Sequence, residues 1–442
     1  MGKPQMTSNP YRLAISEEYL AKQLYDLIAE LFPICRSITG DGVRETLSRL
    51  STVASIQFRE VSSDTEVFDW VVPNEWNIRD AYVKNATGAR VIDFQRSSLH
   101  VVSYSIPVKT RLSLEELRPH LYTLPDQPDL IPYRTSYYEE NWGFCLSQNQ
   151  LDALPEGEYE VCIDTTLKPG SLSYGEIYIP GESDNEVLVS CHICHPSLAN
   201  DNLSGLVIAA YLAKHLKSLR LRFSYRFLFI PATIGSLTWL ACNEPIIPRI
   251  KHGLVLAGLG DPGPLSYKSS RGGDAAIDRA AIHILKQQTE HELFEFSPYG
   301  YDERQYCSPG FNLPVGRLSR TPHGCYPQYH TSADDLNFIQ PGQLAKSCTA
   351  CLDIFDIIEN DRLYLNMKPK GEPRLSKYGL YSSIGGIKAS PNTQMAILWV
   401  LNLSDGEHSL LDIAERSGLR FREVMLAAQA LCAHDLLKEV TS

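Results

Sequence analysis

The sequence has no long apolar run. No stretch approaches the roughly 18 consecutive apolar residues that a membrane-spanning helix needs, so we expect no span. The start, residues 1–23, has no apolar segment behind its basic residue and does not read as a secretory signal. These absences predict a protein of the cytoplasm.

Positive charge is also scarce. Lysine and arginine number 41 against 52 aspartate and glutamate residues, which gives a net charge of −11. Nucleic acids and anionic membranes would repel such a chain, so neither is an expected partner. What is present is a chain of 442 residues with 43% hydrophobic residues, enough for a large buried core.

The cysteines give no sign of a disulfide framework, because their number, 11, is odd and no export signal is found. Two pairs have the C-x-x-C spacing of zinc knuckles, Cys191/Cys194 and Cys348/Cys351. The first pair lies in an apolar run and the second in a helical pattern. We therefore expect reduced thiols rather than a zinc ribbon.

The hydrophobic pattern changes along the chain. Residues 16–32 repeat apolar positions at helical spacing behind a serine cap, and a second helix follows. Short β-rich runs separated by turn residues cover 67–150. From about 158 to 360, apolar strands alternate with helices. That alternation predicts a mostly parallel sheet with helices on both faces.

These patterns predict an α/β domain built from residues 11–66 and 151–360, into which the small β-rich domain 67–150 is inserted. Residues 361–373 have the composition of a linker. The tail, 374–442, has the spacing of a helix–turn–helix, as in winged-helix domains. It carries seven basic and seven acidic residues, and this balance favours packing or protein contact over DNA binding.

Side chains able to do chemistry gather in two segments. His192 and His195 end an apolar strand, and Asp201 follows in a polar turn before a helix. His330 follows an aromatic run, four residues before Asp334. Sites form at the carboxyl ends of strands in open α/β sheets, and imidazole with carboxylate suits a metal such as zinc. Taken singly, each segment could also be a loop that caps a helix.

Together, the two segments resemble those of a known family. VLVSCH…NDNLSG, in residues 187–205, is similar to the metal-binding stretch of the M28-type zinc aminopeptidases, and YHTSADDL, 329–336, to their late histidine segment. The whole chain is identified as a member of a bacterial family described as polysaccharide-biosynthesis proteins with an aminopeptidase-like domain. The matching stretches are LFPICRSITGDGVRETL, VFDWVVPNEWNIRDAY, LHVVSYSIPV, LPDQPDLIPYRTSYYEENWGFCLS, SCHICHPSLANDNLSG, DERQYCSPGFNLPVG and YHTSADDL.

The resemblance implies that His192 and His330 are metal ligands and that Asp201 is the carboxylate that bridges two metals in M28-type enzymes. Those enzymes carry Glu-Glu after the next strand, a general base and a ligand, where this chain has Ala232 and Thr233. A two-metal site is therefore not expected. We expect one zinc ion per chain, held by His192, Asp201 and His330, since three protein ligands and a water form the usual catalytic zinc site.

Without the family glutamate, the proton acceptor must come from another segment. Glu303, with Asp302 beside it, is the candidate base, because YDERQY precedes the His330 loop where M28-type enzymes carry residues facing the substrate. A solvated charge run is the alternative. His195 could be a ligand, a proton shuttle or a packed loop residue.

Other residues are candidates for contact with substrate. Arg36, in an early loop, could clamp a substrate carboxylate or form a structural salt bridge. Tyr138 belongs to an aromatic stretch that could wall a cleft or lie in the core: Tyr133, Tyr137, Tyr138 and Trp142. Arg271 and Glu176 are weaker candidates.

The predicted function is zinc-dependent hydrolysis of an amide or peptide bond in a small amino-acyl conjugate, in a biosynthetic pathway. Two alternatives stay open. One is metal-dependent acyl or aminoacyl transfer, which the missing glutamate would suit. The other is a non-catalytic scaffold with a degenerate metal site. The expected partner is the small conjugate itself, and a homo-oligomer stays open.

Overall fold

The structure, a computed structural model, describes residues 10–380 and 391–440. The chain forms two units, Met1–Asp278 with Glu290–Leu352, and Arg279–Thr289 with Asp353–Ser442. Residues 1–9, part of the start that we inspected for a signal, lie outside the described residues. So do 381–390 and 441–442, which belong to the predicted helix–turn–helix domain.

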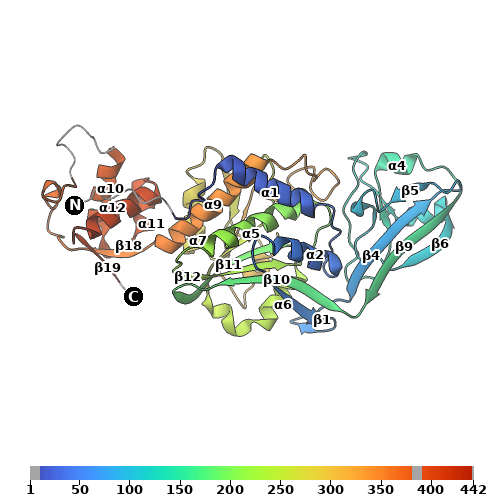
Figure 1. The fold of residues 1–442 in the computed structure, drawn as a ribbon, viewed down its shortest axis with the longest axis horizontal. Helices are drawn as coiled ribbons and strands as arrows, with labels where there is room; N and C mark the ends of the chain where they lie inside the picture. The colour runs from blue at the N-terminus through green and yellow to red at the C-terminus, as the bar shows by residue number, and fades with distance from the viewer. Residues whose placement is uncertain (1–9, 381–390, 441–442) are drawn as a thin grey trace. The chain divides into compact units, whose positions relative to one another are not determined.

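An eight-stranded mixed sheet forms the centre of the first unit (Figure 1). Its four neighbouring strands β12, β11, β13 and β16 are mutually parallel. On one side β10 runs antiparallel to β12 and β1 antiparallel to β10, and on the other side β14 runs antiparallel to β16 while β15 is parallel to β14. In spatial order the strands are β1 (Gln57–Ser62), β10 (Ser171–Ile179), β12 (Phe223–Ile230), β11 (Ser183–His192), β13 (Ile250–Leu256), β16 (Val315–Ser319), β14 (Leu265–Lys268) and β15 (His291–Phe294). The predicted α/β fold with a mostly parallel sheet is confirmed.

The parallel strands are buried because helices cover both faces of the sheet. Side chains such as Leu188 and Val189 in β11 are fully buried, as a near-continuous apolar strand requires. In Figure 1, α1 (Glu17–Leu31), α2 (Asp41–Leu50) and α5 (Gly205–Leu216) lie on one side and α6 (Ile234–Cys242) on the other. The predicted serine cap of α1 is confirmed, since the Ser16 side chain accepts the N–H of Tyr19.

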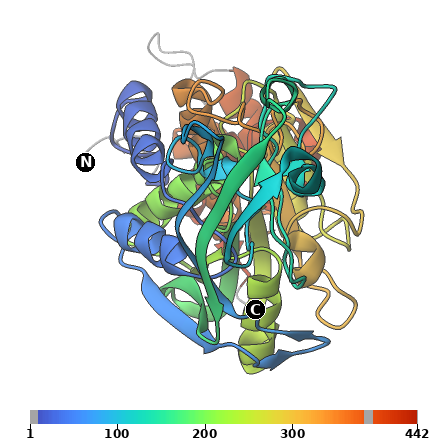
Figure 2. The same ribbon diagram turned by 90° about the vertical axis from the view of Figure 1, so that its right-hand side faces the viewer.

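A four-stranded antiparallel sheet is inserted between β1 and β10. Its strands, in order, are β5 (Arg90–Asp93), β4 (Glu75–Lys84), β9 (Glu158–Lys168) and β6 (Val108–Ser113). Figure 1 labels this insert on the right, and Figure 2 views the molecule from that side. Among the described residues, 67–150 contribute no strand to the eight-stranded sheet.

The insert extends further than the predicted boundary at 150. Strand β9, which we assigned to the α/β domain, pairs with β4 and β6 of the insert. The reason is visible in its alternation, because Tyr159, Val161 and Ile163 are buried while their neighbours are not. One face of β9 therefore completes the core of the insert.

The second unit contains the predicted helix–turn–helix. Helices α11 (Leu410–Ser417) and α12 (Phe421–Cys432) flank a turn in which Gly418 has the left-handed conformation, φ 71°. Helix α10 (Pro391–Leu403) precedes them, and a three-stranded sheet has the order β18 (Asp405–Ser409), β17 (Leu363–Asn366), β19 (Leu437–Glu439). Strand β17 falls inside the predicted linker 361–373, so that segment is part of the folded unit.

Two of the predicted absences can be inspected in the described residues. None of their helices combines the length and apolarity needed to cross a membrane. No disulfide joins the cysteines, and both C-x-x-C pairs are buried. The metal-ligating group found among the described residues contains no cysteine.

Candidate active site

His192 is the last residue of β11, at the carboxyl end of the parallel strands. An irregular turn, Ala199–Ser204, carries Asp201 and leads into α5. Asp334 fixes this turn, because its carboxylate oxygens accept the N–H of Asn200 at 2.6 Å and of Asp201 at 3.0 Å. A side chain thus satisfies backbone groups that no strand or helix satisfies, and it sets the position of Asp201.

Both carboxylate oxygens of Asp201 face imidazoles. His192 Nε2 lies 2.8 Å from Oδ1, and His330 Nε2 lies 3.0 Å from Oδ2. His192 and Asp201 are buried, and the His330 side chain is 31% exposed. The three residues come from β11, the turn before α5 and the loop before α9 (Pro341–Asn360), so only the fold brings them together.

His195 is a third imidazole beside this carboxylate. Its Nδ1 lies 3.9 Å from Asp201 Oδ2, and its ring centroid lies 4.7 Å from that of His192. Nδ1 is buried without a hydrogen-bond partner among the described residues. Burial lowers the pKa of His195 well below its ordinary value, so the ring is neutral, the form that binds a metal.

We call His192, His195, Asp201 and His330 the histidine–aspartate centre. Burial alone would raise the pKa of the Asp201 carboxyl group. The neighbouring imidazoles of His195 and His192, with hydrogen bonds from His192 and His330, outweigh burial and hold this pKa well below its ordinary value. Asp201 is therefore an anion at neutral pH.

The donor set of the centre fits zinc. Ligand atoms of His192, His195 and Asp201 all lie within 4.8 Å of one another, and His330 reaches the same carboxylate. Two or three imidazoles with one carboxylate are typical of catalytic zinc sites. The unpartnered Nδ1 of His195 is an atom that a metal ion would satisfy.

Aromatic rings enclose the centre. Tyr301 stacks on His192 with ring centroids 5.0 Å apart, and Tyr133 stands edge-on against His195 and His330, each at 5.1 Å. Both tyrosines are buried. The sequence pattern suggested Tyr133 as part of an aromatic stretch but did not suggest Tyr301. The only hint of Tyr301 in the sequence is its position directly before the acidic pair in YDERQY.

Asp302 is a buried carboxyl group directly before the short helix α8 (Glu303–Tyr306), and it faces the start of α6. Ser236 Oγ donates to Asp302 Oδ1 at 3.0 Å. Ser236 lies in the first turn of α6, directly after Ala232 and Thr233, the positions of the two glutamates in M28-type enzymes. Burial raises the pKa of Asp302 to about 6. A titratable carboxyl group is therefore present near the place of the missing pair.

Glu303 has different partners. Its Oε1 lies 2.9 Å from Lys268 Nζ and 3.8 Å from Arg317 Nη1. No hydrogen bond or ion pair joins it to the histidine–aspartate centre within the part of the chain that the structure describes. Asp302 and Glu303 are both buried, so the alternative of a solvated charge run is wrong for this segment.

Arg36 is a buried residue that holds the backbone. Its Nε donates to the carbonyl oxygen of His195 at 2.8 Å, and its Nη1 donates to that of Leu31 at 2.8 Å. Burial lowers the pKa of Arg36 to about 10. No salt bridge to a carboxylate is found for it in residues 10–380 and 391–440, so the structural-salt-bridge alternative is wrong.

The remaining candidates for substrate contact lie apart from the centre. Tyr138 is 47% exposed and packs edge-on against Trp70. Arg271 is exposed and donates to Asn312 Oδ1 at 3.0 Å. Glu176 is buried in ion pairs with arginines of the sheet. The structure therefore does not bring Tyr138, Arg271 or Glu176 to the histidine–aspartate centre.

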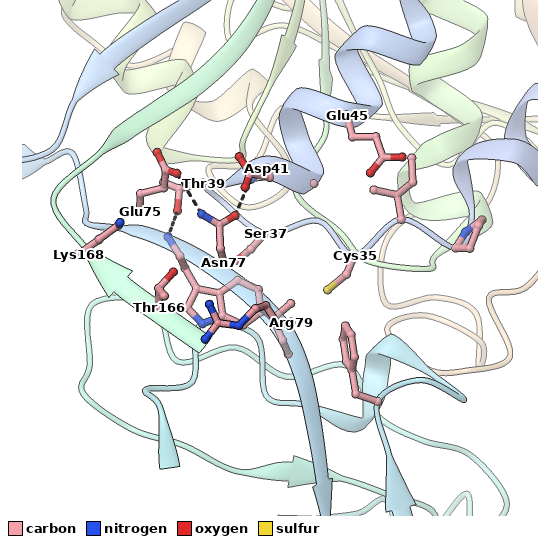
Figure 3. Close-up of a pocket in the computed structure, with 16 residues that line it drawn as sticks. Cys35, Ser37, Thr39, Asp41, Glu45, Glu75, Asn77, Arg79, Thr166 and Lys168 are labelled. Atoms are coloured by element: carbon pink, nitrogen blue, oxygen red, sulfur yellow. Dashed lines mark hydrogen bonds between the residues drawn. The ribbon is translucent and has the colours of Figure 1, made fainter. Parts of the chain in front are cut away.

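A hollow of about 820 Å³ lies beside the segment that carries Arg36 (Figure 3). Cys35 and Ser37 line it, together with polar residues of α2 and β4 such as Glu45 and Asn77. No residue of the histidine–aspartate centre lines it. The size of a hollow is therefore not a guide to the candidate site in this molecule.

The chain matches two family models and a protein of known sequence. Residues 25–361 match the family model "Domain of unknown function (DUF4910)", and residues 362–439 match a winged helix-turn-helix model. A Clostridium acetobutylicum protein described as "Putative polysaccharide biosynthesis protein with aminopeptidase-like domain" is 51% identical over 95% of this chain and 96% of its own length.

Solved structures show the same relationship. A crystal structure described as "putative peptidase", also from Clostridium acetobutylicum, has a TM-score of 0.92 and 49% identity, and covers 96% of this chain and 97% of that chain. A zinc aminopeptidase from Bacillus subtilis has a TM-score of 0.56 at 12% identity, over 77% of this chain and 95% of that chain. The latter likeness shows the aminopeptidase-like fold.

Proposed function

The chain belongs to the DUF4910 family, and we propose that it is a zinc-dependent hydrolase that cleaves an amide or peptide bond of a small amino-acyl conjugate. The observation that carries this proposal is the buried Asp201 with a histidine nitrogen at each carboxylate oxygen, at 2.8 and 3.0 Å. The description of the 51% identical relative favours a role in a biosynthetic pathway.

His192, Asp201 and His330 would hold one zinc ion, with His195 beside them. Such an ion supplies a nucleophilic water at neutral pH and polarises a carbonyl group. Asp334 contributes by fixing the backbone of Asp201, and Arg36 by holding the carbonyl of His195. The protein's own part in the reaction is thus to keep the donor atoms at fixed positions in a dry site.

Asp302 is the group that we propose accepts the proton. It is a carboxyl group with a pKa of about 6, held by Ser236 at the start of α6. A general base works best with a pKa near the working pH. Glu303 suits this task less, because its Oε1 is already engaged in an ion pair with Lys268.

Elemental analysis and an amidase assay test the proposal together. Purified protein should carry about one zinc per chain and release amine from a panel of amino-acyl p-nitroanilides, and a chelator should stop the release. Asp201→Asn should lose both zinc and activity. Asp335→Asn is the matched control, because Asp335 accepts only nearby backbone and side-chain N–H groups of its own turn.

A wild-type protein without zinc, or Asp201→Asn with wild-type zinc content, would contradict the metal site. A zinc-loaded protein that shows no amide cleavage on any member of the panel would contradict hydrolysis. The two results are read independently, because metal content does not depend on having found the right conjugate.

A further inference from the structure

A second buried group of charged side chains lies next to the histidine–aspartate centre. We call Lys268, Glu303, Arg317 and His323 the Lys268–Arg317 cluster. Lys268 and Arg317 are direct cross-strand neighbours in β14 and β16, and both are buried, 3% and 2% exposed. Like charges directly opposite each other destabilise a sheet unless other groups neutralise them.

Glu303 neutralises only part of this charge. Its Oε1 lies 2.9 Å from Lys268 Nζ but 3.8 Å from Arg317 Nη1, which is beyond hydrogen-bond distance. Lys268 also donates to the carbonyl oxygen of Tyr299 at 2.7 Å. The cluster therefore has two cations and one carboxylate, and Arg317 is the cation without a close counter-ion.

The guanidinium of Arg317 has one unused edge. Its Nη1 donates to His323 Nδ1 at 3.0 Å. Neither Nε nor Nη2 has a hydrogen-bond partner among residues 10–380 and 391–440, and Nε is buried. The Nε–Nη2 edge presents two parallel N–H groups, the arrangement that binds a carboxylate or phosphate through two hydrogen bonds.

The unused edge is close to the histidine–aspartate centre. Arg317 lies over the ring of Tyr301, with its guanidinium carbon 5.7 Å from the ring centroid, and Tyr301 stacks on His192 at 5.0 Å. One aromatic ring thus separates the cation from a candidate ligand. His323 covers the cluster from a half-buried position, in the same segment that leads to His330.

We propose that the Lys268–Arg317 cluster is a subsite that binds an oxyanion of the substrate, a carboxylate or a phosphate, beside the scissile bond. This assignment rests on the hydrolase function proposed above. The oxyanion accepts hydrogen bonds from Arg317 Nε and Nη2 and supplies the missing negative charge. The conjugate is then an anionic one.

A binding experiment tests the subsite without any turnover. Wild-type protein is titrated calorimetrically with inorganic phosphate and, separately, with glutarate, with sodium chloride of equal ionic strength as the reference. We expect at least one of the two to bind. Arg317→Gln should weaken that binding by at least about 30-fold, because it removes one partner of a buried charged pair.

Two further variants make the result decisive. Lys251→Gln removes one exposed positive charge from the neighbouring β13 and should bind as wild type does. If Arg317→Gln does not fold, Arg317→Lys decides, because it keeps the charge and removes the two-donor edge, so binding should weaken about tenfold or more.

A substrate experiment links the subsite to cleavage. Glutamyl and O-phosphoseryl p-nitroanilides are compared with the neutral glutaminyl and seryl compounds. Wild-type kcat/KM should favour an anionic member, and Arg317→Gln should bring the ratio of kcat/KM between the anionic and the neutral members close to one. The preferred anion identifies the carboxylate or the phosphate as the group recognised.

Opposite outcomes overturn one proposal or the other. Failure of both phosphate and glutarate to bind wild type, or unchanged binding in Arg317→Lys, overturns the subsite. Anion binding that depends on Arg317, in a zinc-loaded protein that cleaves no amide, supports the subsite and overturns the hydrolase function.

Discussion

Two buried polar groups of the large domain differ in how far the protein alone satisfies them. In the histidine–aspartate centre, both oxygens of Asp201 have partners and Asp334 holds the backbone beneath. In the Lys268–Arg317 cluster, two cations share one carboxylate oxygen, while Arg317 Nε and Glu303 Oε2 have no partner among the described residues. Buried polar groups are normally hydrogen-bonded, so each exception points to something missing.

The exceptions differ in chemistry as well. The unpartnered atom of the centre is an imidazole nitrogen, His195 Nδ1, which suits a cation. The unpartnered donor of the cluster is an N–H of Arg317, which suits an anion. The histidine–aspartate centre therefore suits a metal ion, and the Lys268–Arg317 cluster suits a negatively charged group of the substrate. Variants in one group should leave the binding function of the other intact.

The largest effect should follow from His192→Ala. Without this imidazole, Asp201 loses the partner of Oδ1, and the zinc content should fall well below one ion per chain, with loss of measurable amide cleavage. Elemental analysis and the p-nitroanilide assay check this. As a control, anion binding by the Lys268–Arg317 cluster should persist in this variant. Full retention of zinc would contradict the assignment of His192 as a ligand.

Asp302→Asn should come next. It keeps the shape of the side chain and the contact with Ser236 but removes the proton acceptor, so kcat should fall by about 10²–10⁴-fold while zinc is retained. Ser236→Ala, which removes only the hydrogen bond, should have a smaller effect. The opposite result would assign the role of general base to Glu303. In that case Asp302→Asn stays active, and Glu303→Gln shows a large fall in kcat while its zinc content and fold are unchanged.

The two groups also differ in how much of each the sequence predicted. Two sequence motifs carry the residues of the centre: His192 ends a strand, Asp201 follows in a turn, and His330 lies in a later segment. Their spacing can be recognised in the sequence, so these residues could be predicted individually. Ala232, in place of the family glutamate, likewise showed that a base was missing. What the spacing could not give was the partner of each carboxylate, since that depends on packing between distant segments.

The Lys268–Arg317 cluster shows this limit. Lys268 and Arg317 are 49 positions apart, in strands whose pairing no local pattern specifies. The same limit applied to Arg36, whose burial against backbone carbonyls has no sequence signal, and to β9, whose alternation fits either sheet. Fold class followed from the alternation of strands and helices, which is local, whereas sheet membership and ion pairing are not.

Glu303→Gln tests the cluster through stability. The substitution leaves the Lys268 ammonium buried without its carboxylate, and breaking one side of a buried ion pair costs about 3–5 kcal/mol. Urea unfolding of the large domain measures this. The double variant Lys268→Met with Glu303→Leu should recover much of the loss, because apolar side chains need no counter-ion; equal instability in both would show that packing, not charge, decides.

Asp334→Asn tests the support of the centre. The amide can accept only one of the two backbone N–H groups that the carboxylate now accepts, so the Asp201 turn should loosen. Substitutions of this kind weaken metal binding by about 10–100-fold. Competition with a chelator measures the affinity, and the neighbouring Asp335→Asn should leave it unchanged.

The smallest effect concerns an unpartnered polar atom far from any proposed ligand. His252, in β13, is half-buried against Phe223 with ring centroids 5.0 Å apart, and its Nδ1 has no partner among the described residues. Burial, with the charges of Arg222 and Lys251, lowers the pKa of His252 from 6.5 to about 4.

The folded state therefore binds fewer protons than the unfolded state between these pKa values, and stability is lost as the pH falls from 6.5 toward 4. At pH 5 the loss should be about 2 kcal/mol relative to pH 7. His252→Phe removes the titration, so the difference between urea unfolding at pH 7 and pH 5 should shrink by that amount. An unchanged difference would mean that other groups set the acid sensitivity. If the difference shrinks as expected, the buried Nδ1 of His252 lowers the stability of the folded state without serving a ligand. Arg317 differs, because we propose that its unpartnered edge binds one.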